Sequence, residues 1–197
     1  MKIDENPGLS YERRIEIPFL FIMLERFWDN DFQDKVILDV GTGDYRNDLT
    51  KRGVTVKTCD LNGGDYAGDF VKVSIEEKFD CILFISSLEH FNHKDLNYPD
   101  CEYETRAIIK ARQLLKPSGF IIITLPYGKE EWGKGFINWS ERMKWKVLYG
   151  SGTKVFIEGF WKQGNSIWSE TDEKELAEIG YSTNSTGARG LYCGVWI

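Results

Sequence analysis

Residues 36–45 constrain the fold of this chain more than any other stretch. They form an apolar run, rich in β-branched residues, that carries Asp39 and ends in two alternating glycines, Gly41 and Gly43. A second acidic residue, Asp60, closes the next apolar run about 20 residues further on. Glycines let the backbone approach a ligand where a Cβ atom would collide, and a carboxylate at this spacing can bind ribose hydroxyls. The order strand, glycine turn, helix, strand and carboxylate therefore predicts a site for a nucleotide-type ligand.

The size and charge of the chain limit its organisation and its partners. With 197 residues, 42% of them hydrophobic, residues 1–197 can bury one well-formed core but are too few for two ordinary domains. The formal net charge of −6 argues against binding to nucleic-acid backbones, which needs clustered Lys and Arg. We therefore expect a single domain and no nucleic-acid partner.

The cysteines and the N-terminal residues predict a cytoplasmic protein. The four cysteines are widely spaced, without a C-x-x-C pair, which indicates a reduced setting. Asp4 and Glu5 stand where a signal peptide would be basic. The longest early apolar run, residues 17–24, is far shorter than the roughly 20 residues of a membrane span. We therefore expect no membrane partner either.

Strand-like and helix-like patterns alternate through the first two thirds of the chain. This alternation predicts an α/β fold with a doubly wound, mostly parallel sheet and helices on both faces. The first helix, with Ser10 as its N-cap, belongs to an N-terminal helical extension (1–30) that either packs over the sheet or covers the ligand. Strands are expected at 35–40, 54–59, 65–70, 79–85, 120–125 and 191–197, helices at 10–28, 44–52, 100–115 and 171–180, and a turn at 116–119.

Residues 127–168 differ in composition from the rest of the chain. They hold five of the seven tryptophans and seven Lys or Arg against four Glu, within an acidic protein. This composition predicts an aromatic-rich insertion or cap on the sheet rather than a separate domain. Its tryptophans either form a wall or lid over a small molecule or fill a second small core.

These elements together resemble the class I S-adenosylmethionine-dependent methyltransferases over residues 35–126, with a weaker match at the terminal strand. The family's first motif is an acidic residue followed by glycines, and residues 39–45 match it except that Tyr45 stands where a further glycine is common. Asp60 matches the family's ribose-binding acid. The resemblance implies a Rossmann-like fold with an antiparallel strand near the C-terminus, and S-adenosylmethionine as cofactor.

Later strand ends carry further features of the family. The acid expected near the adenine is Asp69, with Asp65 as a rival. Residues 85–91 resemble the family's leucine, acid, histidine signature, and residues 114–119 resemble its leucine-lysine-proline-glycine-glycine turn. A dehydrogenase fingerprint would need a glycine where Arg46 stands, so a nicotinamide-dependent oxidoreductase is the less favoured alternative.

The resemblance also implies a role for particular side chains. Asp39 would orient the glycine loop and the amino group of the cofactor, Asp60 would accept from the ribose hydroxyls, and Asp69 would accept from the adenine. Ser86 and Leu88 would line the path to the methyl group. The expected cofactor-binding residues are Asp39, Gly41, Thr42, Gly43, Tyr45, Asp60, Leu61, Asp69, Phe70, Ser86 and Leu88.

His90 is the candidate catalytic residue. Histidine readily exchanges a proton near neutral pH, which suits a general base, although a purely structural place in the pocket wall is the alternative. Glu89, His90, His93 and Asp95 could together bind a divalent ion, but they lack a recognised ligand spacing, so no metal is expected.

The sequence gives little information on the methyl acceptor. The fourth strand is followed by Ser86-Ser87-Leu88-Glu89 and not by the Asn or Asp, two prolines and aromatic of base-methylating relatives, and a Pro-Cys pair is absent. With the acidic charge, this favours a small-molecule acceptor methylated on oxygen or nitrogen. A non-catalytic protein that binds S-adenosylmethionine or S-adenosylhomocysteine is the alternative, and the oligomeric state is left open.

Overall fold

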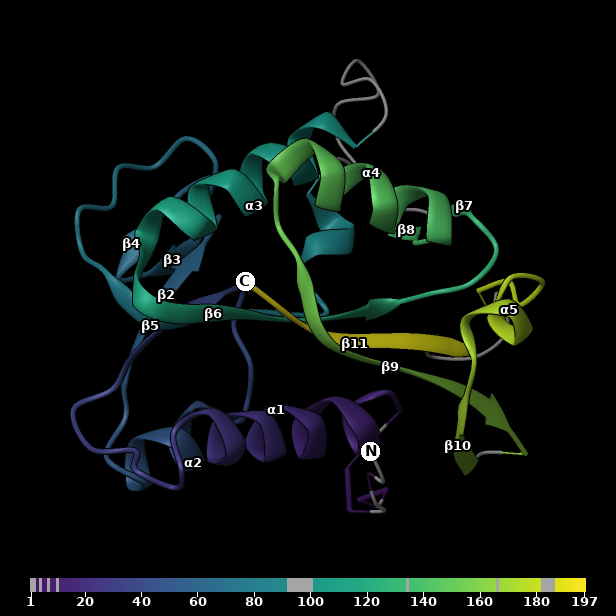
Figure 1. The fold of residues 1–197 in the computed structure, drawn as a ribbon, viewed down its shortest axis with the longest axis horizontal. Coiled ribbons are helices and arrows are strands. Elements are labelled where there is room, and N and C mark those ends of the chain that lie inside the picture. The colour runs from purple at the N-terminus through teal and green to yellow at the C-terminus, as the bar shows by residue number, and fades with distance from the viewer. Residues whose placement is uncertain are drawn as a thin grey trace.

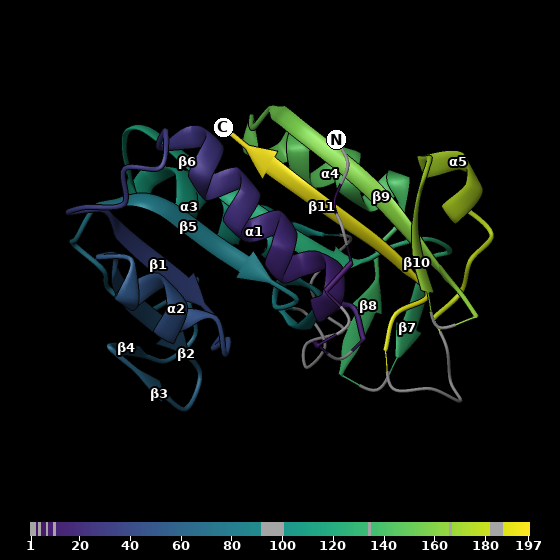
Figure 2. The same ribbon diagram turned by 90° about the horizontal axis from the view of Figure 1, so that it is seen from below.

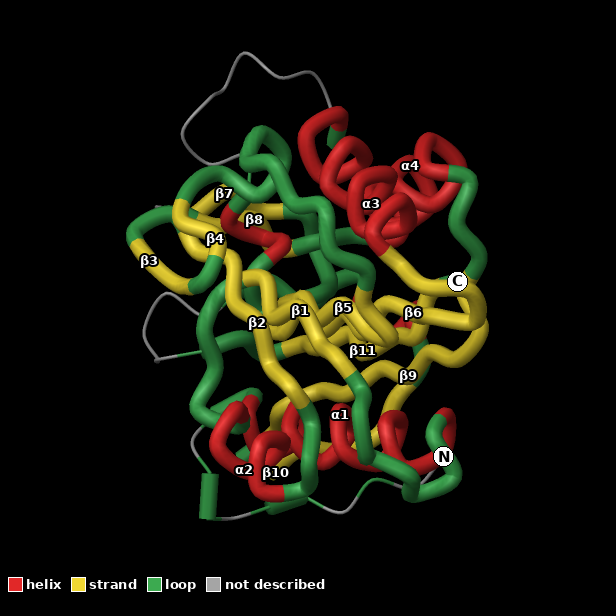
Figure 3. The backbone as a smooth tube through the Cα atoms, turned by 90° about the vertical axis from the view of Figure 1, so that its left-hand side faces the viewer, coloured by secondary structure: helices red, strands yellow, loops and turns green. Residues whose placement is uncertain are grey.

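A central sheet with helices on both faces forms the molecule, with α3 and α4 on one face and α1 and α2 on the other (Figures 1 and 3). The computed structural model describes residues 3, 5–6, 8–9, 11–91, 101–133, 135–165, 167–181 and 187–197. Within this part of the chain, eight strands form one sheet in the order β10-β9-β11-β6-β5-β1-β2-β4. A two-stranded hairpin, β7–β8, stands off this sheet (Figure 2).

The elements follow the predicted alternation closely. In chain order they are α1 Arg13–Phe27, β1 Val36–Val40, α2 Arg46–Lys51, β2 Thr55–Asp60, β3 Gly63–Gly64, β4 Tyr66–Ala67, β5 Phe79–Ile85, the 3-10 helix η1 Leu88–His90, α3 Glu102–Leu114, β6 Leu115–Pro126, β7 Glu131–Gly133, β8 Phe136–Asn138, α4 Glu141–Ser151, β9 Val155–Gly164, β10 Ile167–Thr171, α5 Glu173–Leu176 and β11 Gly190–Trp196.

The predicted fold class is confirmed. Strands β4, β2, β1, β5 and β6 pair in parallel, whereas β11 runs antiparallel to both β6 and β9. The central strands are apolar on both faces because helices cover both faces. In β5 all residues are buried except Asp80, which accepts hydrogen bonds from the Val36 N–H and the Lys116 ammonium.

Three predicted elements are less regular than expected. The helix expected at 171–180 is reduced to α5, Glu173–Leu176. The third strand is reduced to β4, which pairs with β2 only at Cys59↔Tyr66 and Asp60↔Ala67. The turn at 116–119 is absorbed into β6, where four residues lie opposite the single residue Asp80 of β5. Within this stretch Ser118 has a φ of +65°. The chain passes from α3 at Leu114 directly into β6 at Leu115, without a separate loop.

The aromatic region 127–168 differs from the expected insertion or cap. Its strands β9 and β10 extend the main sheet, and α4 packs beside α3. Trp139, Trp161 and Trp168 are buried in the two hydrophobic clusters on either side of the sheet. They therefore fill the main core, and strand β8 of this region contacts η1, which follows β5 in the chain.

Helix α1 is held to the sheet by a buried carboxylate as well as by apolar contacts. It begins at Arg13 with Glu12 as N-cap residue; Ser10, the predicted N-cap, lies outside the described residues. Glu16 is fully buried, and its Oε1 accepts hydrogen bonds from the hydroxyls of Ser86 (2.5 Å) and Thr124 (2.7 Å). Its Oε2 pairs with the Arg13 guanidinium at 3.0 Å. No helix within the described ranges is long and apolar enough to cross a membrane.

The Glu16→Ala substitution should lower the free energy of unfolding by about 3–5 kcal/mol, because the hydroxyls of Ser86 and Thr124 lose their buried acceptor. Urea denaturation followed by circular dichroism measures the change. Glu25→Ala, which breaks the half-exposed Glu25–Arg52 pair, is the matched control and should cost less than about 1 kcal/mol. Equal losses in the two variants would contradict the anchoring role of Glu16.

Candidate cofactor and methyl-transfer site

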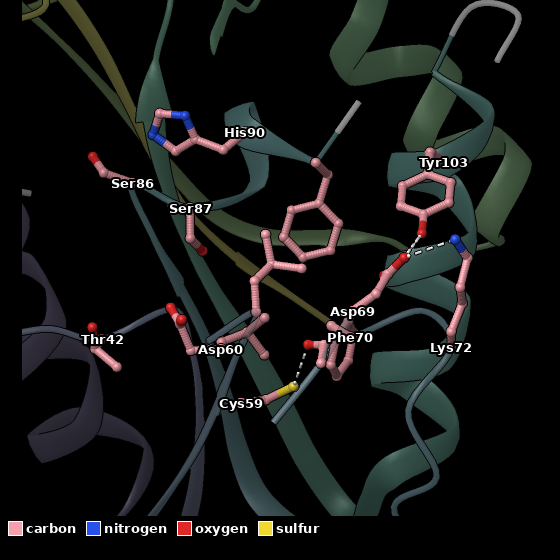
Figure 4. A pocket seen from close by; sticks show the side chains of 15 residues that line it. Thr42, Cys59, Asp60, Asp69, Phe70, Lys72, Ser86, Ser87, His90 and Tyr103 are labelled. Carbon is pink, nitrogen blue, oxygen red and sulfur yellow. Dashed lines mark hydrogen bonds and ion pairs between the residues drawn. The ribbon is translucent and has the colours of Figure 1, made fainter. Parts of the chain in front are cut away.

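A cavity of about 470 Å³ opens at the carboxyl ends of β1, β2 and β5. The chain leaves β1 toward β2 and β4 and later returns on the other side to form β5 and β6, so this edge is a topological switch point. Residues from the β1 turn, the β2 end, the loop after β4, the β5 end and α3 line the cavity (Figure 4). Its volume lies within the range of about 300–1,000 Å³ typical of small-molecule sites.

The turn after β1 forms one wall through Gly41 and Thr42. Gly41 has φ +99°, and a Cβ atom there would lie 3.1 Å from the Cβ of Ser87. Its N–H donates to the carbonyl of Cys59 at 2.9 Å. A glycine is therefore required where this turn passes between the ends of β2 and β5.

Asp39, Gly43 and Tyr45 lie behind this wall and do not line the cavity. The Tyr45 hydroxyl donates to Asp39 Oδ1 at 2.6 Å, and the Gly43 N–H donates to Oδ2 at 3.3 Å. A Cβ atom on Gly43 would lie 2.0 Å from the Tyr45 ring. Gly43 is therefore needed to make room for Tyr45.

Burial governs the ionisation of this internal pair. It raises the pKa of Asp39 from 3.8 to about 6, against the opposing hydrogen bonds from Tyr45 and Gly43. Burial and the neighbouring Asp39 raise the pKa of the Tyr45 hydroxyl well above its usual value. Tyr45 therefore remains a hydrogen-bond donor to Asp39 across the ordinary pH range.

The end of β2 supplies Asp60 and Leu61 to the cavity. Asp60 Oδ1 accepts from the backbone N–H of Asn62 at 3.0 Å, which orients the carboxylate at the strand end. Asp65, the rival acid, lies elsewhere: its Oδ2 accepts from the Thr58 N–H at 2.9 Å and its Oδ1 pairs with Lys57 at 3.2 Å. Asp65 therefore shapes the turn after β2.

Asp69 and Phe70 line the far end of the cavity, together with Lys72 and Tyr103. Asp69 Oδ2 accepts from the Tyr103 hydroxyl and pairs with the Lys72 ammonium at 3.2 Å, and its Oδ1 accepts from the Val71 N–H at 3.0 Å (Figure 4). A carboxylate offers about four acceptor positions, so Asp69 keeps capacity for one further donor.

The opposite end of the cavity is formed by Ser86, Ser87 and His90 (Figure 4). The Ser87 hydroxyl oxygen is buried and has no hydrogen-bond partner among the described residues, as is expected of a group that faces a ligand. His90 Nδ1 lies 2.6 Å from the carbonyl oxygen of Gly135, in the β7–β8 connection. A carbonyl can only accept, so neutral His90 carries its proton on Nδ1 and keeps a lone pair on Nε2.

Leu88 joins Asp39, Gly43 and Tyr45 among the expected residues that lie outside the cavity, and several unexpected residues line it. Leu88 is fully buried in the core and does not line the cavity, because η1 turns its side chain inward. Phe91 lines the cavity directly after His90, and its ring lies 6.3 Å from that of Phe70. Tyr103 and Lys72 reach it from α3 and from the loop after β4, without any motif that singles them out.

The possible metal ligands are only partly described. Glu89 Oε1 lies 3.9 Å from His90 Nε2, and His93 and Asp95 lie outside the described residues. Within the ranges that the structure describes, no group of three His, Cys, Asp or Glu side chains could hold a metal ion.

Comparison with known proteins identifies the fold. No family model matches the chain, and no curated protein does. Solved structures do: 1,6-didemethyltoxoflavin-N1-methyltransferase from Burkholderia thailandensis, which holds 1,6-didemethyltoxoflavin and S-adenosylhomocysteine, matches with a TM-score of 0.61 at 14% identity, over 92% of this chain and 76% of that one. The chain has the class I methyltransferase fold.

Two further solved structures share this methyltransferase fold. An S-adenosylmethionine-dependent methyltransferase from Clostridium acetobutylicum matches with a TM-score of 0.59 at 12% identity, over 95% of this chain and 92% of that one. The N-methyltransferase NodS from Bradyrhizobium japonicum, in complex with S-adenosylhomocysteine, matches with a TM-score of 0.51 at 12% identity, over 91% and 87%. At these identities the likeness establishes the fold and not the substrate.

The contribution of the Tyr45–Asp39 hydrogen bond to stability should depend on pH. Because folding raises the Asp39 pKa, ionisation of Asp39 lowers stability as the pH rises between 3.8 and about 6, and the Tyr45 hydroxyl offsets part of this loss above that range. Tyr45→Phe should therefore lower the free energy of unfolding by about 1.5–3 kcal/mol at pH 8, but by about 0.5–1.5 kcal/mol at pH 5.

Urea denaturation at the two pH values measures both losses. Tyr66→Phe, which removes the hydroxyl bonded to the exposed Glu77, is the matched control and should change stability by less than about 0.5 kcal/mol at either pH. A loss at Tyr45→Phe that is the same at pH 5 and pH 8 would contradict the charge-assisted hydrogen bond.

Proposed function

We propose that this protein binds S-adenosylmethionine in the cavity and transfers its methyl group to an oxygen or nitrogen of a small molecule. One observation carries the proposal: a single cavity has the acceptors Asp60 and Asp69 along one side and Ser86, Ser87 and His90 at the other end. The two carboxylates suit the hydroxyl and amino donors of a nucleoside. The hydroxyls and the imidazole at the other end suit the place where the methyl group is transferred. The ligands of the neighbours that share the fold support the same assignment.

The chain offers a matching group for each part of the nucleoside. Asp60 accepts from the ribose hydroxyls and Asp69 accepts from the adenine amino group, since each carboxylate keeps acceptor capacity toward the cavity. The rings of Phe70 and Phe91 supply an apolar wall for a flat base. Gly41 lets the backbone of the β1 turn come close to the ligand.

The other end of the cavity suits the transfer itself. When bound, the cofactor supplies a methyl group on a positively charged sulfur, already activated for displacement. The chain has to hold the acceptor atom about 3–3.5 Å from that methyl group in a site shielded from water. The Gly135 carbonyl fixes the His90 ring, so that Nε2 can take the proton that the acceptor loses.

Asp60→Ala should weaken the binding of S-adenosylmethionine by about 1–3 kcal/mol, because the ribose hydroxyls lose a buried acceptor. Isothermal titration calorimetry with S-adenosylmethionine and S-adenosylhomocysteine measures the change. Asp48→Ala on the exposed face of α2 is the control and should leave the Kd within twofold. Unchanged affinity in a folded Asp60→Ala variant would remove Asp60 from the site, and binding of NAD without S-adenosylmethionine would overturn the proposed function.

His90→Asn should lower kcat by about 10²–10⁴-fold and leave the Kd of S-adenosylmethionine within twofold, because it removes the group that accepts the proton. Formation of S-adenosylhomocysteine with a methylated acceptor is the readout. An unchanged kcat would show that His90 only forms part of the wall. A protein that binds the cofactor but produces no S-adenosylhomocysteine with any acceptor would be a binding protein and not an enzyme.

A further inference from the structure

Three carboxyl groups gather beside the His90 end of the cavity. Glu12 and Glu16 come from the start of α1 and Glu89 comes from η1, and each acts electrostatically on another member of the group. The start of α1 lies beside the tip of β5 (Figure 2), where Ser86 lines the cavity and donates to Glu16. We call Glu12, Glu16 and Glu89 the acidic cluster.

Arg13 acts electrostatically on Glu12 and Glu89, but among the described residues it pairs only with Glu16. Its guanidinium pairs with Glu16 Oε2 at 3.0 Å, while Ser86 and Thr124 satisfy Glu16 Oε1. Glu89 is 3% exposed, and its Oε2 is buried without a hydrogen-bond partner among the described residues. The Oε2 atom of Glu12 is likewise buried without a hydrogen-bond partner among the described residues. Two carboxyl groups of the acidic cluster therefore each have a buried oxygen whose hydrogen bonding the described residues do not satisfy.

Burial is the main influence on the ionisation of Glu89 and Glu12. Burial raises the pKa of Glu89 well above its usual range, Glu16 and Glu12 raise it further, and Arg13 opposes them. Burial and Glu16 likewise raise the pKa of Glu12. Buried carboxyl groups in this condition are stabilised by a cation that brings N–H donors.

Glu89 also lies within reach of the reacting end of the cavity. Its Oε1 is 3.9 Å from His90 Nε2, so one nitrogen atom can make hydrogen bonds of about 2.9 Å to both atoms at once. Burial, Glu12 and Glu89 raise the pKa of the Tyr181 hydroxyl. The Tyr181 ring lies 4.1 Å from that of Phe136. Carboxylates beside the reacting end of the cavity favour a cationic ligand and disfavour an anionic one.

We infer that the methyl acceptor is a small basic amine whose nitrogen binds between Glu89 and His90. This inference rests on the proposed methyltransferase function. The acidic cluster attracts the protonated amine, and His90 Nε2 takes one proton so that the nitrogen presents a lone pair. That lone pair forms the new carbon–nitrogen bond, and the carbon–sulfur bond breaks with its electron pair kept by sulfur, which becomes neutral. A second proton leaves the methylated nitrogen for water when the product is released as a free amine.

An acceptor panel tests the class of substrate. The intact protein is incubated with methyl-labelled S-adenosylmethionine and with matched amines and alcohols: benzylamine and benzyl alcohol, tryptamine and tryptophol, 1,4-diaminobutane and 1,4-butanediol. We expect label in amines, at a rate at least tenfold above that of the matched alcohol. Label in the alcohols at equal or higher rates, or binding of S-adenosylmethionine without label in any amine, would overturn the inference. Absence of S-adenosylmethionine binding would instead overturn the proposed function.

Glu89→Gln tests the residue, with the best amine of the panel as acceptor. The KM for the amine should rise about 10-fold to 100-fold, as expected from the loss of a hydrogen bond to a charged group, while the Kd of S-adenosylmethionine stays within twofold. Glu178→Gln, at an exposed position after α5, is the matched control and should change neither value. Glu12→Gln provides the same readout if Glu89→Gln does not fold. An unchanged KM, or an equal loss of cofactor affinity, would overturn the role of the acidic cluster.

Discussion

The placement of β1 between β2 and β5 is the constraint on which the rest of the structure depends. Because the chain extends the sheet first on one side of β1 and then on the other, the connections diverge above its carboxyl end. The divergence leaves space between the turn that starts at Gly41 and the loop that starts at Ser86. The candidate ligand-binding groups border this space from the ends of β1, β2 and β5, from the loop after β4, from η1 and from α3.

The strand ends could be predicted from the sequence because they are set by local patterns. The run Phe79–Ile85 is long, apolar and bounded, and it forms β5 with the expected limits. The direction of a side chain near a strand end is not local: Leu88 points into the core because η1 coils, and Asp39 points toward Tyr45 because the ring fills the space beside it. Motif matching therefore finds the segments that border the cavity, and packing decides which of their side chains line it.

Contacts between segments far apart in the chain could not be predicted from the sequence, for a different reason. Tyr103 meets Asp69 only because α3 packs over the sheet, a contact between positions 34 residues apart. The composition of residues 127–168 likewise could not show whether they form a cap or strands at the edge of the sheet. Trp161 and Trp168 lie on β9 and β10, where antiparallel pairing extends the sheet and buries both rings in its main core. A tryptophan-rich segment predicts burial, but not which layer it completes.

The anchoring of α1 has a consequence for how the chain acquires its structure. Glu16 finds its two hydroxyl partners 70 and 108 residues further along the chain. During synthesis the helix therefore emerges long before Ser86 and Thr124, and its apolar face, with Phe19 and Leu20, has no surface to cover until β6 has formed. Contacts of such long sequence separation form slowly. The apolar face of α1 thus stays uncovered until the strands that it packs on have been synthesised, and a nascent chain arrested before β6 would expose this face to chaperones.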